Sequence, residues 1–427
     1  MGERIYWQDG VPLAPIAAGD VPDTVDIAII GAGFTGLSAG IHLARAGHSV
    51  AIFEAAQAGA GGSSRCGGMI GPSFHKLGLA GLAAQYGQER AHDIQAEGLR
   101  ALSMFTDFVR AEGIDCDLTM CGRFRGMATP ADYDATAAEA ARLRDAIGLE
   151  FHMIPQSEQH REIGSDRYYG GILYPNDGAI QPHKLIQGLV DRFIAAGGQV
   201  FEGTPVTDLS RVGGAVTLRH PNGTCRAGQV LVATNAYSDA ATAQMRDRVI
   251  PIRVSAIATA PMDLNAVQSM SPSGRIFGET KRVFLWYRPT PDGTRMIFGG
   301  RTTGRTGRTD ICARQLMAQA RDIFPDLPDE TPDFIWRGQV AHTLDHAPHL
   351  GQIDGLWYAG GYGGSGITRS VFFGRQVARR MLGQRGGETA FDDLPFNPVP
   401  MRAFAPLAAR IATRWYAFQD RLDAARL

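Results

Sequence analysis

The stretch from Asp26 to Glu54 constrains the fold of this chain more than any other segment. It opens with the apolar run Asp-Ile-Ala-Ile-Ile, typical of a buried strand, and continues into the glycine turn 31–36, Gly-Ala-Gly-Phe-Thr-Gly. An apolar-periodic segment to Ala46 predicts a helix, and Ser-Val-Ala-Ile-Phe before Glu54 predicts a second strand. Strand, glycine turn, helix and strand in this order predict a Rossmann-like unit that binds a dinucleotide at the turn.

Each glycine of the turn has its own steric role. Gly31 permits the tight turn, Gly33 lets the backbone approach a pyrophosphate, and Gly36 lets the helix pack closely on the strand. The helix N-terminus supplies amide donors and a positive dipole end for the phosphates. Glu54 follows Gly36 by 18 positions, where its carboxylate is placed to hold a ribose diol.

The segments after Glu54 bear on which dinucleotide binds. Ala55 and Ala56 leave no arginine for a 2′-phosphate, which disfavours NADP. The run 61–68, Gly-Gly-Ser-Ser-Arg-Cys-Gly-Gly, offers hydroxyls and free amides to a ligand that extends beyond the first pyrophosphate. A flexible surface loop is the alternative interpretation of that run. NAD and FAD both remain open at this point.

A second glycine segment near the C-terminus favours FAD. Gly361, Gly363 and Gly366 repeat the first spacing, and a helical segment from Ile367 to about Leu382 follows them. No acid-tipped strand comes next, so we interpret this segment as backbone passing close to a flat ring, with a helix N-terminus that stabilises negative charge on a reduced flavin. A plain strand-turn-helix crossover is the alternative.

Composition limits the function classes. A chain of 427 residues exceeds one hydrophobic core and predicts two domains. The net charge of -1 gives no indication of nucleic acid or of a membrane surface, and no signal peptide or membrane helix is predicted. Five scattered cysteines without a CxxC motif argue against a disulfide framework or a zinc site, which leads us to expect a reducing, cytoplasmic location.

Several further anchors, in order, resemble those of a known superfamily. They include Tyr6-Trp7, the first glycine turn, the run 63–68, Gln181-Pro-His-Lys-Leu185, Val230–Tyr237, Thr343-Leu-Asp345 through Gly351, the second glycine segment and the tail Trp415–Leu422. On these anchors the chain resembles the FAD-dependent amine oxidoreductases of the D-amino acid oxidase, glycine oxidase and sarcosine oxidase superfamily, and within it the gamma-glutamylputrescine oxidoreductases.

The resemblance implies an α/β fold with a Rossmann-like FAD-binding domain of the glutathione-reductase type, and an α+β substrate domain built on a mixed or antiparallel sheet. It implies non-covalent FAD, because no cysteine follows Trp336. The residues expected along the cofactor are Gly31, Gly33, Phe34, Thr35, Gly36, Glu54, Ala55, Ser63, Ser64, Arg65, Gly67, Gly68, Val206, Asn235, Gly361, Gly363, Gly364, Gly366 and Ile367.

Three positions depart from the pattern of the relatives. Ser365 stands where many relatives have a histidine, and Thr368 stands where sarcosine oxidases have a lysine that grips a substrate carboxylate. Ile297 aligns roughly with the lysine that sarcosine oxidases use to promote reaction with oxygen, a lysine that the gamma-glutamylputrescine relatives also lack. The electron acceptor is therefore open: oxygen is expected, and a quinone or carrier is the alternative.

The expected FAD-binding domain is discontinuous, covering residues 24–85, 165–245 and 338–385. Residues 86–164 and 246–337 form the expected substrate domain, with a helix near 131–146 and a hairpin of strands 283–287 and 296–300. Residues 391–427 form a helical tail whose apolar positions Leu407, Ile411, Trp415 and Phe418 are expected to dock on their own domain, with partner binding as the alternative.

The expected reaction is oxidation of the C–N bond of a primary or secondary amine, polyamine-derived or amino-acid-like, by hydride transfer to flavin N5. The resulting imine hydrolyses to an aldehyde or oxo acid. Candidate catalytic residues are Ser365, His342, Tyr287 and Trp286, of which only one of the last two can face the ring because they alternate on a strand. Candidates for a substrate carboxylate are Arg125, Arg282, Arg288 and Arg301. A non-catalytic flavin-binding protein remains the alternative outside the enzymes.

Overall fold

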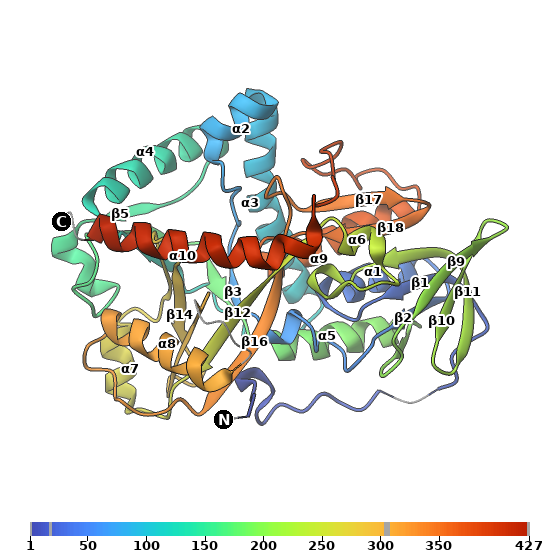
Figure 1. Cartoon of the computed structure of the whole chain (residues 1–427), viewed down its shortest axis with the longest axis horizontal. Helices are drawn as coiled ribbons and strands as arrows, with labels where there is room; N and C mark the ends of the chain where they lie inside the picture. Colours follow the sequence, from blue (N-terminus) through green and yellow to red (C-terminus); the bar gives the residue numbers. More distant parts are fainter. Residues whose placement is uncertain (1, 17–18, 303–307, 425–427) are drawn as a thin grey trace.

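The computed structural model describes residues 2–16, 19–302 and 308–424, which build two large β-sheets (Figure 1). In that view the first sheet lies to the right with helices α1 and α5, and the second lies to the left with α7 and α8. The prediction of a Rossmann-like unit beside a mixed sheet is confirmed.

The first sheet has strand order β17-β18-β11-β1-β2-β8, and its four pairings from β18 to β8 are parallel. Strand β17 is antiparallel to β18, and the antiparallel strands β9 and β10 extend from β11. The strand bounds are β1 Thr24–Ile30, β2 Val50–Phe53, β8 Gln199–Phe201, β9 Asp208–Val212, β10 Ala215–His220, β11 Gly223–Val232, β17 His349–Ile353 and β18 Leu356–Gly360.

Side chains of β1 alternate between two cores. Ile27 and Ile29 join the cluster formed with the helices, whereas Ala28 and Ile30 join the cluster beneath β9 to β11. A parallel strand covered on both faces has to be apolar throughout, and this explains the uninterrupted apolar run in the sequence.

The second sheet has strand order β16-β12-β15-β14-β13-β4-β6-β5 and is mixed, since β13 and β4 pair in parallel. The expected hairpin is present as β14 and β15. The strand bounds are β4 Arg123–Gly126, β5 His152–Ile154, β6 Gly171–Tyr174, β12 Ile250–Ala258, β13 Ile276–Glu279, β14 Leu285–Pro289, β15 Met296–Gly300 and β16 Phe334–His342. A small separate sheet pairs β3 Met69–Ile70 with β7 Gly178–Ala179.

Helices cover both sheets. Helix α9 packs against α1 and α3 over the first sheet, and α8 packs against β12 and β15 of the second. The α-helices are α1 Phe34–Arg45, α2 Gly78–Tyr86, α3 Gln88–Ala111, α4 Pro130–Ile147, α5 Pro182–Ala195, α6 Ala243–Arg246, α7 Leu264–Met270, α8 Thr309–Ile323, α9 Gly366–Met381 and α10 Ala405–Ala424. The 3-10 turns are η1 Tyr6–Gln8, η2 Ser63–Arg65, η3 Gln156–Arg161, η4 Asn235–Tyr237 and η5 Arg402–Phe404.

The division into domains stays a prediction. Two elements pack with a part of the fold other than the one to which their segment was assigned. Strand β6 lies within the expected FAD segment 165–245 but pairs with β4 and β5 of the second sheet. Helix α3 lies within the expected substrate segment 86–164 but packs on α9. Sequence order alone does not assign these elements, because the chain passes between the two large sheets several times.

The expectation that the apolar positions of the tail dock on their own domain is wrong. Leu407, Ile411, Trp415 and Phe418 lie on the exposed face of α10, and Ile411 retains 61% of its accessible surface. The helix is attached instead through its polar side, where Asp420 accepts hydrogen bonds from the Arg282 side chain and from the Val283 amide. None of the helices in the described part of the chain is long and apolar enough to cross a membrane.

Candidate functional site

The first glycine turn lies between the end of β1 and the start of α1. Gly31 has φ +103°, a conformation that strongly favours glycine, and its amide donates to the Phe53 carbonyl. A Cβ on Gly36 would lie 2.1 Å from the Gly31 carbonyl oxygen, so only glycine allows this approach of helix and turn. A Cβ on Gly33 would lie 3.0 Å from Ser63 Oγ, which itself accepts from the Phe34 amide at 3.2 Å. The glycines therefore let the turn lie close against the N-terminus of a twelve-residue helix.

Glu54 lies at the tip of β2 with its carboxylate directed back to the turn. Its Oε2 accepts from the Ala32 amide at 2.9 Å and its Oε1 accepts from the Ala56 amide at 3.0 Å. Each carboxylate oxygen has a second lone pair, so the group retains acceptor capacity for a ribose diol. Ala55 is exposed beside it, and Val206 is buried beneath the neighbouring edge of the sheet.

The two glycine segments, far apart in sequence, are joined by hydrogen bonds. The Thr35 and Tyr362 hydroxyls lie 2.7 Å apart, and Asn235 Oδ1 accepts from the Gly361 amide at 2.9 Å. Helices α1 and α9 pack closely where Ser38 Oγ donates to the Val371 carbonyl. Tyr362 was missed by the sequence reasoning, although its place between the glycines of the second segment was a usable signal.

The segment 63–68 runs from the first turn toward the second sheet. The Ser64 side chain is buried and bonded to His183 Nδ1 at 2.9 Å, so its hydroxyl already has a protein partner. The Arg65 guanidinium binds the Ala60 carbonyl, the Arg337 carbonyl and the Glu3 carboxylate. These two side chains hold the segment in place through hydrogen bonds to the protein itself.

Trp286 and Tyr287 point to opposite faces of β14, as alternation requires. The Trp286 ring lies against the backbone of Gly67, where an added Cβ would come within 2.8 Å of it. Tyr287 is fully buried between Phe277 and Phe298, and its hydroxyl lies 2.9 Å from that of Tyr168. Trp286 is thus the member of the pair that faces the glycine segment, and Tyr287 belongs to the core.

His342 ends β16 directly beside the second glycine segment. A Cβ on Gly363 would lie 3.9 Å from His342 Nδ1, and His342 Nε2 lies 3.2 Å from Arg301 Nη2. Burial, helped by the charges of Lys76 and Arg301, lowers the pKa of His342 to about 3, so the imidazole is neutral. Since arginine can only donate, Nε2 accepts and Nδ1 carries the proton. This arrangement argues against His342 as a proton acceptor and makes Nδ1–H a donor.

Ser365 precedes α9 and is exposed, as is Gly364. Within the described parts of the chain its side chain makes no capping hydrogen bond to the helix. Gly363 and Gly364 have φ +62° and +98°, and no described atom would lie closer than 3.6 Å to a Cβ built on either. Gly366 and Ile367 then begin α9. The segment therefore presents open backbone and a helix N-terminus on one side of His342.

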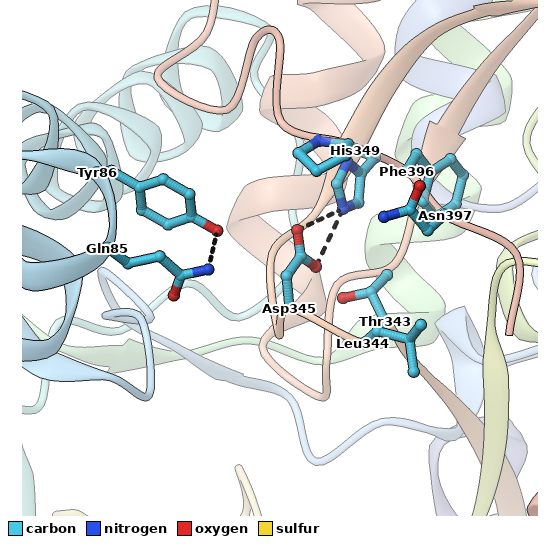
Figure 2. A pocket seen from close by; sticks show the side chains of 9 residues that line it. Gln85, Tyr86, Thr343, Leu344, Asp345, His349, Phe396 and Asn397 are labelled. Carbon is cyan, nitrogen blue, oxygen red and sulfur yellow. Dashed lines mark hydrogen bonds and ion pairs between the residues drawn. The ribbon is translucent and has the colours of Figure 1, made fainter. Parts of the chain in front are cut away.

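A separate pocket of about 270 Å³ lies between α2, the β16–β17 loop and the tail (Figure 2). Its centre is the Asp345–His349 pair, with His349 stacked on Phe396 at 4.4 Å. Burial works to raise the Asp345 pKa, but the hydrogen bonds from His349 and the Ala347 amide outweigh it and hold that pKa below its usual value. The pocket contains none of the predicted site residues. Its remaining lining residues are Gln85, Tyr86, Thr343, Leu344, Pro395 and Asn397.

The residues of the two glycine segments fit a flavin dinucleotide. Close-packed glycines at a helix N-terminus suit a pyrophosphate, and the Glu54 carboxylate suits a ribose. The second open glycine segment suits a further planar group beyond them. Residues 26–380 match the family described as FAD dependent oxidoreductase. The chain belongs to this family of FAD-dependent oxidoreductases.

Relatives of this oxidoreductase align over nearly its whole length. It is 29% identical to gamma-glutamylputrescine oxidoreductase of Escherichia coli over 403 residues, covering 93% of each chain. It is 28% identical to a probable oxidoreductase of Haemophilus influenzae over 413 residues, covering 93% of this chain and 92% of the relative. The crystal structure of glycine oxidase from Geobacillus kaustophilus superposes with a TM-score of 0.72 at 23% identity, covering 89% of this chain and 99% of that one. The predicted superfamily, fold and cofactor are confirmed.

Proposed function

We propose that this FAD-dependent oxidoreductase oxidises the C–N bond of a primary or secondary amine with a polar or amino-acid-like tail, such as a polyamine derivative. Bound FAD supplies the acceptor for the hydride that leaves the carbon next to nitrogen. Water then splits the resulting imine to an aldehyde or an oxo acid. The names of its relatives, a gamma-glutamylputrescine oxidoreductase and a glycine oxidase, support an amine or amino acid as substrate.

The observation that carries this proposal is the charge around His342. Arg301 and Lys76 act on the imidazole as cations, and the imidazole itself stays neutral. Positive surroundings disfavour an ammonium ion, so an amine bound here loses its proton more easily. Hydride loss requires the neutral amine, and no side-chain base is then needed. The same cations attract a negatively charged tail.

Arg301 is the best of the four arginines considered for a substrate acid group. Arg282 pairs with Asp420 and Asp423, and Arg288 donates to the Gly68 and Ile180 carbonyls. Arg125 is directed to the Glu279 carbonyl. For Arg301 no ion pair is found in the described ranges of the chain, and its bond to His342 leaves further donors for a carboxylate.

The remaining candidate residues have positioning roles in this proposal. Trp286 limits water beside Gly67 and orients the substrate over the ring, and the hydroxyl of Ser365 and Nδ1–H of His342 donate hydrogen bonds at the second glycine segment. We propose no contact with substrate for Tyr287, because its hydroxyl is held in the core.

The acceptor in the proposal is oxygen, and a dehydrogenase that passes electrons to a quinone or carrier is the second candidate. Ile297 favours that alternative, because it is fully buried among apolar side chains and supplies no cation at the position where sarcosine oxidases carry a lysine. We further propose that the enzyme works in the cytoplasm, where its five free cysteines stay reduced.

The test is anaerobic mixing of the holoenzyme with polyamines, acylated polyamines, N-methyl amino acids and D-amino acids, while the flavin absorbance is recorded. Loss of the oxidised-flavin band with one class identifies the substrate, and rapid recovery in air identifies an oxidase. Slow recovery assigns the dehydrogenase. Arg301→Gln is expected to raise KM for a carboxylate-bearing amine and to leave an uncharged amine unaffected. A panel in which no amine bleaches the flavin contradicts the proposal and favours a non-catalytic flavin protein.

A further inference from the structure

Helix α10 carries a continuous apolar stripe on its outer face. Five large side chains recur at intervals of three or four residues, which places them on one side of an α-helix. All five are exposed, Trp415 to 55% and Ile411 to 61%. The stripe consists of Leu407, Ile411, Trp415, Phe418 and Leu422. Phe404, exposed to 65%, continues it just before the helix.

The stripe does not belong to the core of the molecule. In Figure 1 the helix, in red, crosses the near face of the molecule as a single rod, and it packs on β12. Its inner side holds the buried Thr413 and the Asp420–Arg282 ion pair. Single exposed apolar residues are ordinary on a protein surface, but a contiguous row of this kind marks a binding surface.

The charges of the helix are divided between its two sides. Arg410, Arg414 and Arg421 are exposed and each follows a stripe residue by three positions, which places all three on one flank of the stripe. Across the described residues these arginines form no ion pair that would neutralise them. Asp420 and Asp423 are directed away from the flank, toward Arg282. The outer face is therefore apolar with a purely cationic border.

A second copy of the chain is a poor match for this face. In an antiparallel pairing of two such helices the same flanks meet, so the arginines of one copy would oppose those of the other. In a parallel pairing the arginines would meet the opposite flank, which carries Ala408, Ala412 and Gln419 and offers no counter-charge. An anionic surface with an apolar layer beneath it matches both the stripe and its border.

We propose that the outer face of α10 docks on an anionic lipid surface, with the helix lying in the plane of the membrane interface and not spanning it. An apolar face with tryptophan and a cationic border is the pattern of helices that bind in this way. Trp415 would lie at the headgroup level, and the arginines would contact lipid phosphates.

Flotation of the holoenzyme with vesicles tests the proposal. We expect binding to phosphatidylcholine vesicles that contain about one-third phosphatidylglycerol, at least about tenfold stronger than binding to phosphatidylcholine alone and weakened by salt. Arg410→Gln, Arg414→Gln and Arg421→Gln together should lower partitioning on the order of a hundredfold, because each arginine near the surface contributes about fivefold. The double variant Ile411→Glu, Trp415→Glu should abolish binding.

Leu264→Glu is the matched control, since Leu264 is exposed to 60% on α7 and lies outside the stripe. The bound-flavin spectrum and turnover in solution should be unchanged in all variants, which separates docking from folding and from the proposed reaction. Absence of binding to the anionic vesicles, or binding that the double variant retains, overturns the proposal. A dimer by light scattering that the double variant dissociates would assign the face to a second copy and also overturn it.

Discussion

Replacing Gly36 by alanine tests the steric argument for the cofactor turn. The new Cβ would lie 2.1 Å from the Gly31 carbonyl oxygen, although such contacts are essentially never shorter than 3.0 Å. The backbone must therefore shift by about 1 Å, and overpacking of this kind costs about 1–3 kcal/mol. The protein without FAD can relax by moving α1 away from the turn, but the bound state needs the original spacing of the amides. A cost of about 2 kcal/mol placed on the bound state corresponds to about a thirtyfold loss of FAD affinity.

The assay is titration of the FAD-free protein with FAD, followed by quenching of flavin fluorescence. Gly278→Ala serves as the control, because a Cβ there meets nothing within 4 Å in the described part of the chain and its φ lies outside the left-handed region. Alanine has a higher helix propensity than glycine, so the melting temperature of FAD-free Gly36→Ala should change little. A dissociation constant within about twofold of the wild-type value, or an equal loss in Gly278→Ala, would refute the reasoning.

Three further predictions follow from individual contacts. Burial raises the pKa of Glu97 from 4.5 to about 7. The protonated Glu97 side chain therefore stabilises the fold below pH 4.5, and this stabilisation, about 3 kcal/mol in all, is lost as pH rises through about 7. Glu97→Gln should flatten the dependence of the melting temperature on pH over this window. Asn235→Ala leaves the Gly361 amide unpaired and should weaken FAD binding by about 1–3 kcal/mol in the same fluorescence titration. Unchanged FAD affinity would show that this hydrogen bond does not support the cofactor site. Tyr287→Phe removes the bond to Tyr168 and should cost about 1 kcal/mol in urea unfolding with turnover preserved, and loss of turnover would show that Tyr287 does reach the reacting atoms.

The sequence predicted local elements better than it predicted which faces meet. The glycine turn, its flanking strands and the β14–β15 hairpin follow from residue types with strict conformational preferences, and they are present where expected. Alternation placed Trp286 and Tyr287 on opposite faces of their strand, but which face lies against Gly67 depends on packing between distant segments. Residue type alone could not reveal this.

The same limit explains the tail and the arginines. Helical periodicity grouped the apolar positions of α10 on one side, yet periodicity does not reveal whether that side meets the protein or the surroundings. Arg65 was expected along the cofactor because the run 63–68 resembles that of the superfamily. Its side chain bonds the Arg337 carbonyl and Glu3, partners that are near only after the chain has folded.

The bonds from Thr35 to Tyr362 and from Asn235 to Gly361 affect when the enzyme can acquire its cofactor. Thr35 and Tyr362 are 327 residues apart in the sequence, and Asn235 and Gly361 are 126 residues apart. A growing polypeptide on the ribosome lacks the second segment until most of it has been made. FAD loading is therefore a late event in biosynthesis, and a product truncated before residue 361 should emerge without colour even when its N-terminal half is intact.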